Sequence, residues 1–416
     1  MRVGRFVIAS TLRSLKVGQL DFANSYIQAR LREILESSVL HTRAAVRLLQ
    51  EVKPDCALFM DRGYCGTGEI CDQAISQGID TLTWNLGYKS NRLVFKRYNL
   101  GNRADHPLAL SAESWRRLCS MPWKSEYGHQ IRQELFQCYQ AQDWMGFVGT
   151  QFDKKILSQD MTRNTLGLSS DRKVALIFPH ILWDGSFFFG EDLFDDYTEW
   201  LVETIRAAVA NPRLQWVVKL HPAHVVKTKQ GNHPEKPAEL KVIEQVFGTL
   251  PAHLKLVYPD TEISTYSLLE IADYTITVRG TVGIEAALFG IPVVTAGTGR
   301  YAGRGFTLDS STRQEYLHKL ATLARYSRLS AEQVKLAERF AYGTLFCRPL
   351  NLSSASLEYE RDGLATPRLT VKCQTRQEWL RAPDMRQLAA WFADGKTEDM
   401  LVLPSEIGAV DGVEHG

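Results

Sequence analysis

Short apolar runs alternate with amphipathic stretches along most of the chain, which is the pattern of an α/β protein. The pattern is clearest in the second half, where apolar runs predict buried strands over residues 174–178, 214–220, 254–258, 274–278 and 291–295. Amphipathic segments predict helices between them, over residues 198–209, 238–247, 265–272 and 282–289. Strands separated by helices indicate a parallel sheet with crossover connections.

The first half follows a similar but less regular pattern. We predict strands over residues 3–10, 56–60 and 81–85, and helices over residues 21–51, 70–76, 112–120 and 127–143. Basic and aromatic side chains are interleaved over residues 91–98, which could hold an anionic acceptor, but the pattern favours a solvated edge strand. A glycine-rich turn over residues 61–69 separates the strand 56–60 from its helix, and it lacks the Gly-Lys-Ser/Thr ending of a Walker loop.

The length of 416 residues predicts two domains, each with its own core. We expect an N-terminal α/β domain over residues 1–160 and a C-terminal α/β domain over residues 170–330. The polar stretch 158–172 would link them, and residues 331–416 would form C-terminal helices and a tail that partly pack back on the first domain.

Two strand ends in the second half carry candidate binding residues. The strand 214–220 contains Lys219 and runs into His221 and Pro222, and proline stops the strand there. The strand 274–278 runs into the turn 279–281. Since ligands of open parallel sheets bind at the carboxyl ends of strands, both ends are expected to face one crevice.

The turn 279–281 is small, polar and basic, and it precedes a helix. Thr281 is placed as the N-cap of helix 282–289, and the free N–H groups of a helix N-terminus favour an anion. We therefore predict a phosphate site that includes Arg279, Gly280 and Thr281, although a surface salt bridge for Arg279 and an ordinary cap for Thr281 are the alternatives. Ser264 can cap the helix 265–272, and we assign it and Pro222 to the same site.

This ordered series of motifs resembles the capsule polysaccharide biosynthesis family over about residues 172–310. The shared features are Lys-x-His-Pro at 219–222, Thr-Val-Gly-Ile-Glu-Ala-Ala at 281–287, Gly-Ile-Pro-Val-Val at 290–294 and Tyr-x-Gly-Arg-Gly-Phe at 301–306. The resemblance implies a GT-B-like fold, with two Rossmann-like domains that face a central cleft and extra C-terminal helices. The chain is more distantly similar to the polyol-phosphate polymerases of teichoic acid synthesis.

The resemblance implies transfer of a sugar from a nucleotide-activated donor. His221 would then donate to the leaving phosphate with Lys219 as a nearby point charge, and Glu285 would accept hydrogen bonds from ribose hydroxyls. An acid in the first helical turn that complements the helix dipole is the alternative for Glu285. Family members usually carry a Ser-Ser or Ser-Thr pair where this chain has Gly280-Thr281, so a CMP-Kdo-like donor and a UDP-sugar both stay open.

Asp184, in a Trp-Asp-Gly turn, is the candidate catalytic base, and burial would raise its pKa. Asp61 and Glu69 in the glycine-rich turn are the rival carboxylates. The glycine-rich loop that follows residue 296 could close over a donor or acceptor, or be a plain surface loop; its candidate binding residues are Arg300, Tyr301 and Arg304.

Composition narrows the function classes. The net charge of +2 argues against a nucleic-acid partner, and no apolar run is long enough to span a bilayer. The 7 cysteines form no Cys-x-x-Cys pair, which favours reduced thiols. No Asp-x-Asp motif or metal-ligand spacing occurs, so we expect no metal and no cofactor, the nucleotide-sugar being a substrate.

The sequence thus predicts a cytoplasmic glycosyltransferase of bacterial surface polysaccharide synthesis, with a glycan or glycolipid acceptor. Peripheral contact with the inner membrane face or with an export complex fits such a role. A CDP-alcohol-dependent polyol-phosphate transferase and a non-catalytic nucleotide-sugar-binding partner are the alternatives.

Overall fold

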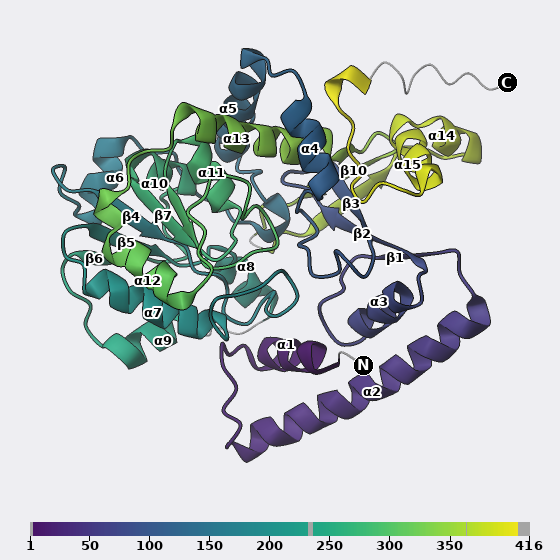
Figure 1. Cartoon of the computed structure of the whole chain (residues 1–416), viewed down its shortest axis with the longest axis horizontal. Helices are drawn as coiled ribbons and strands as arrows, with labels where there is room; N and C mark the ends of the chain where they lie inside the picture. Colours follow the sequence, from purple (N-terminus) through teal and green to yellow (C-terminus); the bar gives the residue numbers. More distant parts are fainter. Residues whose placement is uncertain (1–2, 232–235, 363, 407–416) are drawn as a thin grey trace.

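The computed structural model describes residues 3–231, 236–362 and 364–406. Its strands form a five-stranded sheet, a four-stranded sheet and a two-stranded ribbon, with helices packed around them (Figure 1). The α/β class predicted from the sequence is confirmed.

The five-stranded sheet occupies the second half of the chain and is parallel throughout, in the order β6-β5-β4-β7-β8. Its strands are β4 (Val174–Ile177), β5 (Gln215–Lys219), β6 (Leu254–Val257), β7 (Tyr274–Thr277) and β8 (Val293–Thr295). All carboxyl ends therefore lie at the same edge of the sheet, and the end of β4 lies between the ends of β5 and β7.

Alternate residues of the central strand β4 pack against helices on opposite faces of the sheet. Ala175 and Ile177 belong to one core, with α7 (Tyr197–Val209), α9 (Ala238–Phe247) and α12 (Arg313–Ala321). Val174 and Leu176 belong to the other, with α10 (Thr265–Ile271), α11 (Val282–Leu288) and α13 (Ala331–Tyr342). Burial on both faces explains why these strands read as continuous apolar runs.

The four-stranded sheet has the order β1-β2-β3-β9 and is mixed. Strands β1 and β2 are parallel, whereas β3 is antiparallel to both β2 and β9. Their bounds are β1 (Cys56–Phe59), β2 (Asp80–Leu86), β3 (Arg92–Tyr98) and β9 (Leu350–Asn351). The long helix α2 (Ser25–Val52) packs against α1 (Val3–Leu15) and α3 (Thr67–Ser76) along the lower edge of the molecule in Figure 1.

The remaining elements lie around this sheet or connect the two sheets. Helices α4 (Ala112–Ser120) and α5 (Ser125–Gln140) pack against α13, and α8 (Ala223–Gln230) follows β5. The chain then adds the ribbon β10 (Ala355–Tyr359) and β11 (Pro367–Val371), and the helices α14 (Arg376–Arg381) and α15 (Pro383–Asp394). Residues 407–416 of the expected tail lie outside the described residues.

Two local predictions are wrong. Residues 3–10 belong to helix α1 and not to a strand, because a short apolar run fits either element and here packs against α2 and α3. The stretch 158–172, expected to link the domains, contains the helix α6 (Gln159–Leu166), which is capped by Ser158 and packs against α10. The expected edge strand 91–98 is β3, which lies inside its sheet between β2 and β9.

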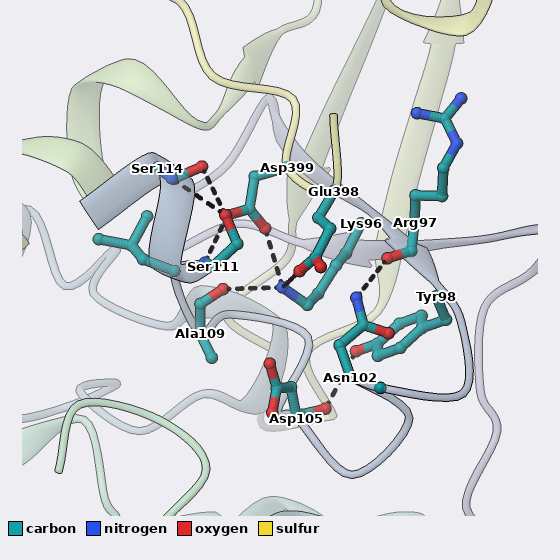
Figure 2. A network of polar contacts seen from close by, with 12 residues as sticks. Lys96, Arg97, Tyr98, Asn102, Asp105, Ala109, Ser111, Ser114, Glu398 and Asp399 are labelled. Atoms are coloured by element: carbon teal, nitrogen blue, oxygen red, sulfur yellow. Dashed lines mark hydrogen bonds and ion pairs between the residues drawn. The ribbon is translucent and has the colours of Figure 1, made fainter. Parts of the chain in front are cut away.

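Two acids near the C-terminal end of the described chain, Glu398 and Asp399, pair Lys96 of β3 (Figure 2). Lys96 is fully buried, and its Nζ donates to Asp399 at 3.0 Å and to the carbonyl oxygen of Ala109 at 3.4 Å. Arg348 lies 3.3 Å from the same carboxylate, which also accepts from the backbone N–H of Ser111 at 2.7 Å. These contacts fix the C-terminal segment on the four-stranded sheet.

Candidate functional site

A cleft of about 350 Å³ lies at the carboxyl edge of the five-stranded sheet, and its walls come from both halves of the chain. One wall is formed by residues that follow β4, β5 and β7, and the other by residues from the segment 139–151 and by His106. The expectation that the ends of β5 and β7 face one crevice is confirmed. Of the residues selected from the sequence, the cleft brings together Asp184, Lys219, His221, Pro222, Gly280, Thr281, Glu285 and Arg300.

Lys219 is the last residue of β5, and only 2% of its surface is exposed. Its Nζ has no hydrogen-bond partner among the described residues. Burial, together with repulsion from Lys154, lowers the pKa of Lys219 to about 7. The ammonium can therefore gain both a partner and its full charge when an anion enters the cleft.

His221 follows β5 and presents one ring nitrogen for chemistry. Its Nδ1 accepts from the backbone N–H of Ala223 at 3.2 Å, which leaves Nε2 as the nitrogen that can donate. Burial and the nearby cations and imidazoles, among them His224 and His180, hold the pKa of His221 well below its usual value. The ring is therefore a neutral donor at pH 7.

Two further histidines line the cleft. The Nε2 of His180 accepts from the backbone N–H of Arg279 at 3.3 Å, and its ring stacks on Tyr197 with centroids 4.8 Å apart. Burial and then the positive charges of Arg279 and Arg300 lower the pKa of His180 to about 3. His106 also has a lowered pKa, mainly because it is buried. All the histidines of the cleft are thus neutral at pH 7.

Tyr301 fixes the turn after β7 through a hydrogen bond. The Tyr301 hydroxyl donates to the carbonyl oxygen of Gly280 at 2.7 Å, and the backbone N–H of Gly280 donates to Thr277 Oγ1 at 3.2 Å. Thr281 occupies the N-cap position of α11, as predicted, but its backbone is helical (φ −51°, ψ −33°) and its side chain makes no capping bond. Thr281 instead lines the cleft.

Glu285 is buried, with 3% of its surface exposed, at the floor of the cleft. The Tyr139 hydroxyl donates to its Oε2. Burial raises the pKa of Glu285 to about 7, although Tyr139, Trp144, Thr281 and Arg300 each act to lower it. This carboxyl group is therefore close to half-protonated at neutral pH.

Asp184 lines the cleft and is ion-paired with Lys227. Burial by itself would raise the pKa of Asp184, but the charge of Lys227 and the hydrogen bonds from Lys227 and Tyr64 outweigh it and lower the pKa. The Tyr64 hydroxyl donates to Oδ1 at 2.7 Å. The expectation of a raised pKa is wrong, because the position of Lys227 was not foreseen.

The guanidinium of Arg279 does not line the cleft. It is 3% exposed and forms an ion pair with Asp192. Its other donors reach the carbonyl oxygen of Thr298 at 2.9 Å, the hydroxyl of Tyr197 at 3.1 Å and the carbonyl oxygen of Glu191 at 3.2 Å. Every nitrogen of the guanidinium is thus engaged with the neighbouring loops, so this side chain is not free for the phosphate contact predicted from the sequence.

Of the loop residues, only Arg300 reaches the cleft. Its Nε is buried without a hydrogen-bond partner among the described residues, and burial lowers its pKa to about 10. Tyr301 instead packs against Phe306 and Phe340. Arg304 donates to the carbonyl oxygen of Leu110 at 2.7 Å, so both are structural in this conformation.

The other selected residues also lie outside the cleft. Ser264 caps α10 and is buried, while its neighbour Thr265 lines the cleft. Asp61 lies on the surface, 3.9 Å from Arg13. Glu69 is buried in the capping of α3, where it accepts from the backbone N–H of Gly66 at 2.7 Å and from the Ser38 hydroxyl. The two rivals of Asp184 as a base are thus removed from the site.

Several lining residues were not predicted from the sequence: His106, Tyr139, Trp144, Gln151, His180 and Lys227. His180 follows strand β4 directly after Pro179, so its place at a strand end was a usable signal. The side chains from the segment 139–151 carry no motif, and only tertiary packing brings them to the cleft.

No helix in the described part of the chain combines the length and the apolar character needed to cross a membrane. Within residues 3–231, 236–362 and 364–406, no group of at least three His, Cys, Asp or Glu side chains could hold a metal ion.

Among solved structures, the chain is similar to Thermosulfurimonas dismutans KpsC, beta Kdo 2,4 transferase. The identity is 17%, the match covers 76% of this chain and 83% of that one, and the TM-score is 0.42. It is also similar to UDP-GlcNAc 2-epimerase from Neisseria meningitidis bound to UDP-GlcNAc, at 16% identity, 77% and 78% coverage and a TM-score of 0.34. A match to the wall teichoic acid polymerase TagF (H444N variant) has 15% identity, covers 45% of this chain and 42% of that one, and has a TM-score of 0.27.

No curated protein sequence matches the chain. Residues 159–338 match the family model described as capsule polysaccharide biosynthesis protein, and this range contains the five-stranded sheet and the wall of the cleft that follows β4, β5 and β7. The resemblance to the capsule polysaccharide biosynthesis family is therefore confirmed over residues 159–338.

Proposed function

We propose that this protein is a glycosyltransferase of bacterial surface polysaccharide synthesis that binds a nucleotide-activated sugar in the cleft. The observation that carries the proposal is a pair of buried nitrogen atoms of cationic side chains in the cleft, Lys219 Nζ and Arg300 Nε, that have no hydrogen-bond partner among the described residues. A buried donor of a cationic side chain without a partner costs free energy, so a site that keeps two of them suits an anionic ligand. The match of residues 159–338 to the capsule polysaccharide biosynthesis family supports the same substrate class.

In this proposal the charge on the leaving phosphate is met by the protein itself. Lys219 and Arg300 supply positive charge, and His221 Nε2 donates a hydrogen bond to a phosphate oxygen. Backbone N–H groups of the turn that contains Gly280 and Thr281 add dipoles of the same sign. No step needs a metal ion.

Two carboxyl groups are available for the acceptor and the ribose. Asp184 lines the cleft, where it could contact an acceptor hydroxyl, but its ion pair with Lys227 makes it a weak base until that contact breaks. Glu285 has the pKa better matched to proton transfer at pH 7, but its buried place beside Thr281 fits contact with the ribose hydroxyls equally well. We retain Asp184 as the base and Glu285 as the ribose-binding residue.

Calorimetry with CMP, CDP, UMP and UDP tests the site, each with and without magnesium. We expect at least one of them to bind without the metal, and Lys219→Met to weaken that binding by about tenfold or more, since a charge-assisted bond is lost. Lys155→Met is the matched control, because Lys155 is an exposed lysine outside the cleft. Absence of binding by all four nucleotides, or equal effects of the two substitutions, would overturn the proposal.

Turnover of labelled donors separates the enzyme from a non-catalytic binding partner. His221→Ala should reduce turnover by roughly two to three decades while the unfolding transition is kept, since a donor to the developing charge is removed. Wild-type turnover in this variant would remove His221 from the mechanism. Transfer from a CDP-alcohol, with none from CMP-Kdo or a UDP-sugar, would favour the polyol-phosphate transferase instead.

A further inference from the structure

A second pocket lies between α1, α3 and the loops around residues 103 and 187, away from the cleft. Its volume is about 40 Å³, enough for a few water-sized groups and hence about the size of one oxyanion. It shares no lining residue with the cleft. Three arginines and aromatic side chains line it, among them Arg5, Arg62, Arg103, Phe6 and Phe188.

Arg62 is the central residue of this pocket. It comes from the glycine-rich turn after β1, and only 8% of its surface is exposed. Its guanidinium donates to the carbonyl oxygens of Arg103, at 2.5 Å, and of Asp105, and lies 3.9 Å from the centroid of the Tyr98 ring. Its Nε is buried and has no hydrogen-bond partner among the described residues. A buried, fixed guanidinium with a free donor is suited to an oxyanion.

The glycines of the turn let the aromatic walls approach Arg62. A Cβ at Gly63 would lie 2.2 Å from Cε2 of Phe188, and a Cβ at Gly68 would lie 2.8 Å from Cδ1 of Phe6. Side chains at these positions would displace both rings. The glycine-rich motif, which the cleft does not use, thus builds this pocket.

The charge of the pocket is positive. Arg5 is exposed and Arg103 is partly exposed, so both can turn toward a ligand that contacts Arg62. Asp72 is the acidic residue in the lining, and it is outnumbered by the arginines. The aromatic rings of Phe188, Phe189 and His106 separate this pocket from the cleft, with successive centroids 5.3 Å and 4.7 Å apart.

We propose that this pocket binds an oxyanion, a carboxylate or phosphate, carried by the acceptor glycan. The binding of an oxyanion rests on Arg62 and the pocket alone, and its assignment to the acceptor rests on the proposed glycosyltransferase function. The rings of Phe188, Phe189 and His106 lie between this pocket and the donor cleft. A charged group of a long acceptor can therefore lie in the pocket while another part of the acceptor enters the cleft.

Binding of inorganic phosphate, of glucuronate and of glucose to the full chain tests the proposal by calorimetry. Glucuronate and glucose differ by the carboxylate, so glucuronate should bind and glucose should not. The double variant Arg5→Gln/Arg103→Gln should weaken binding of both anions by about tenfold or more, since charge-assisted bonds are lost. Arg368→Gln/Arg376→Gln removes the same charge from exposed positions outside the pocket and should leave binding unchanged.

The cleft variant Lys219→Met separates this site from the donor site. Anion binding that survives Lys219→Met and is lost in Arg5→Gln/Arg103→Gln supports the pocket, whatever the nucleotides do. Anion binding that is lost in Lys219→Met and unchanged in the double arginine variant overturns it, as does the absence of any anion binding. Binding of phosphate without glucuronate would support the pocket and identify the charged group of the acceptor as a phosphate. Arg62→Lys keeps the positive charge but removes the Nε donor, and it should also weaken the binding of both phosphate and glucuronate.

Discussion

At the scale of residues, the cleft holds ionisable groups far from their ordinary protonation states. Lys219 and Glu285 both titrate near pH 7, the first because its ammonium is buried without a partner and the second because burial outweighs its hydrogen bonds. Such groups mark functional sites more often than chance, since their environment costs stability that only a ligand restores. The sequence identified both residues, but their ionisation depends on packing.

Lys219→Met should change the pH dependence of stability above pH 7. The folded pKa of Lys219 is about 7 and its ordinary value is 10.5, so between these the unfolded state binds more protons and the free energy of unfolding rises with pH. The variant should lose this rise and be more stable than the wild type at pH 7. Urea unfolding between about pH 7 and 10 measures it, and an unchanged slope would mean that Lys219 is not buried as a free ammonium.

Glu285→Gln should change the pH dependence of the free energy of unfolding below pH 7, in the direction opposite to that of Lys219→Met. The folded pKa of Glu285 is about 7 and its ordinary value is 4.5, so the folded state binds more protons between them and the free energy of unfolding falls as pH rises through this range. Glutamine can still accept from Tyr139 but does not titrate. The variant should lose this fall, as measured by urea unfolding between about pH 4.5 and 7, and a fall that persists would contradict the assignment.

At the scale of elements, the turn after β7 is positioned by close packing under it. Tyr301 reaches the carbonyl oxygen of Gly280 only because Gly283, in the first turn of α11, leaves room for its ring. A Cβ at Gly283 would lie 2.1 Å from the Tyr301 hydroxyl oxygen and 2.6 Å from Cζ. The Thr-Val-Gly-Ile-Glu series thus includes a glycine required by packing.

Gly283→Ala should therefore destabilise the protein by about 1–3 kcal/mol, as overpacking of a filled core does. The matched control is Gly4→Ala in α1, where a Cβ would meet nothing within 4 Å. That variant should be neutral or more stable by up to about 1 kcal/mol, because alanine favours a helix over glycine. Thermal unfolding measures the stability change of both variants. Equal effects of Gly283→Ala and Gly4→Ala would contradict the packing argument.

At the scale of the whole molecule, the C-terminal segment returns to the first sheet. Strand β9 pairs with β3. Asp399 lies within ion-pair distance of Lys96 (Figure 2) and also of Arg348. Burial alone would raise the pKa of Asp399, but these two cations and the Ser111 N–H hold it well below its usual value. The carboxylate therefore stays charged through the whole range in which the protein would work.

Asp399→Asn should destabilise the protein by about 3–5 kcal/mol, because it removes the carboxylate that Lys96 and Arg348 share and leaves Lys96 only the more distant Glu398, at 3.9 Å. Glu262→Gln is the control, since Glu262 pairs with Lys155 on the surface with side chains 68% and 63% exposed. That substitution should cost less than about 0.5 kcal/mol. Urea unfolding compares the two, and a small effect of Asp399→Asn would show that this network does not hold the C-terminal segment.

Much of the fold could be predicted from the sequence because its strongest signals are local. The strands and helices of the five-stranded sheet agree with the predicted segments within a few residues, since strands buried on both faces give continuous apolar runs. The strand predicted over residues 3–10 failed because a short apolar run fits either element. The edge strand predicted over residues 91–98 failed because β9, its second neighbour, lies more than 250 residues away in sequence.

The candidate site, like the fold, was predicted from the sequence only in part. The sequence by itself determined that Lys219, His221, Thr281 and Glu285 follow or flank strand ends, and parallel strands bring such residues to one edge. Only the tertiary structure decided which side chains face the cleft and which are already paired. In the folded chain Arg279 forms an ion pair with Asp192, and Lys227 forms one with Asp184. Ion pairs form between side chains that are close in space, and sequence spacing does not show which side chains of separate elements are close.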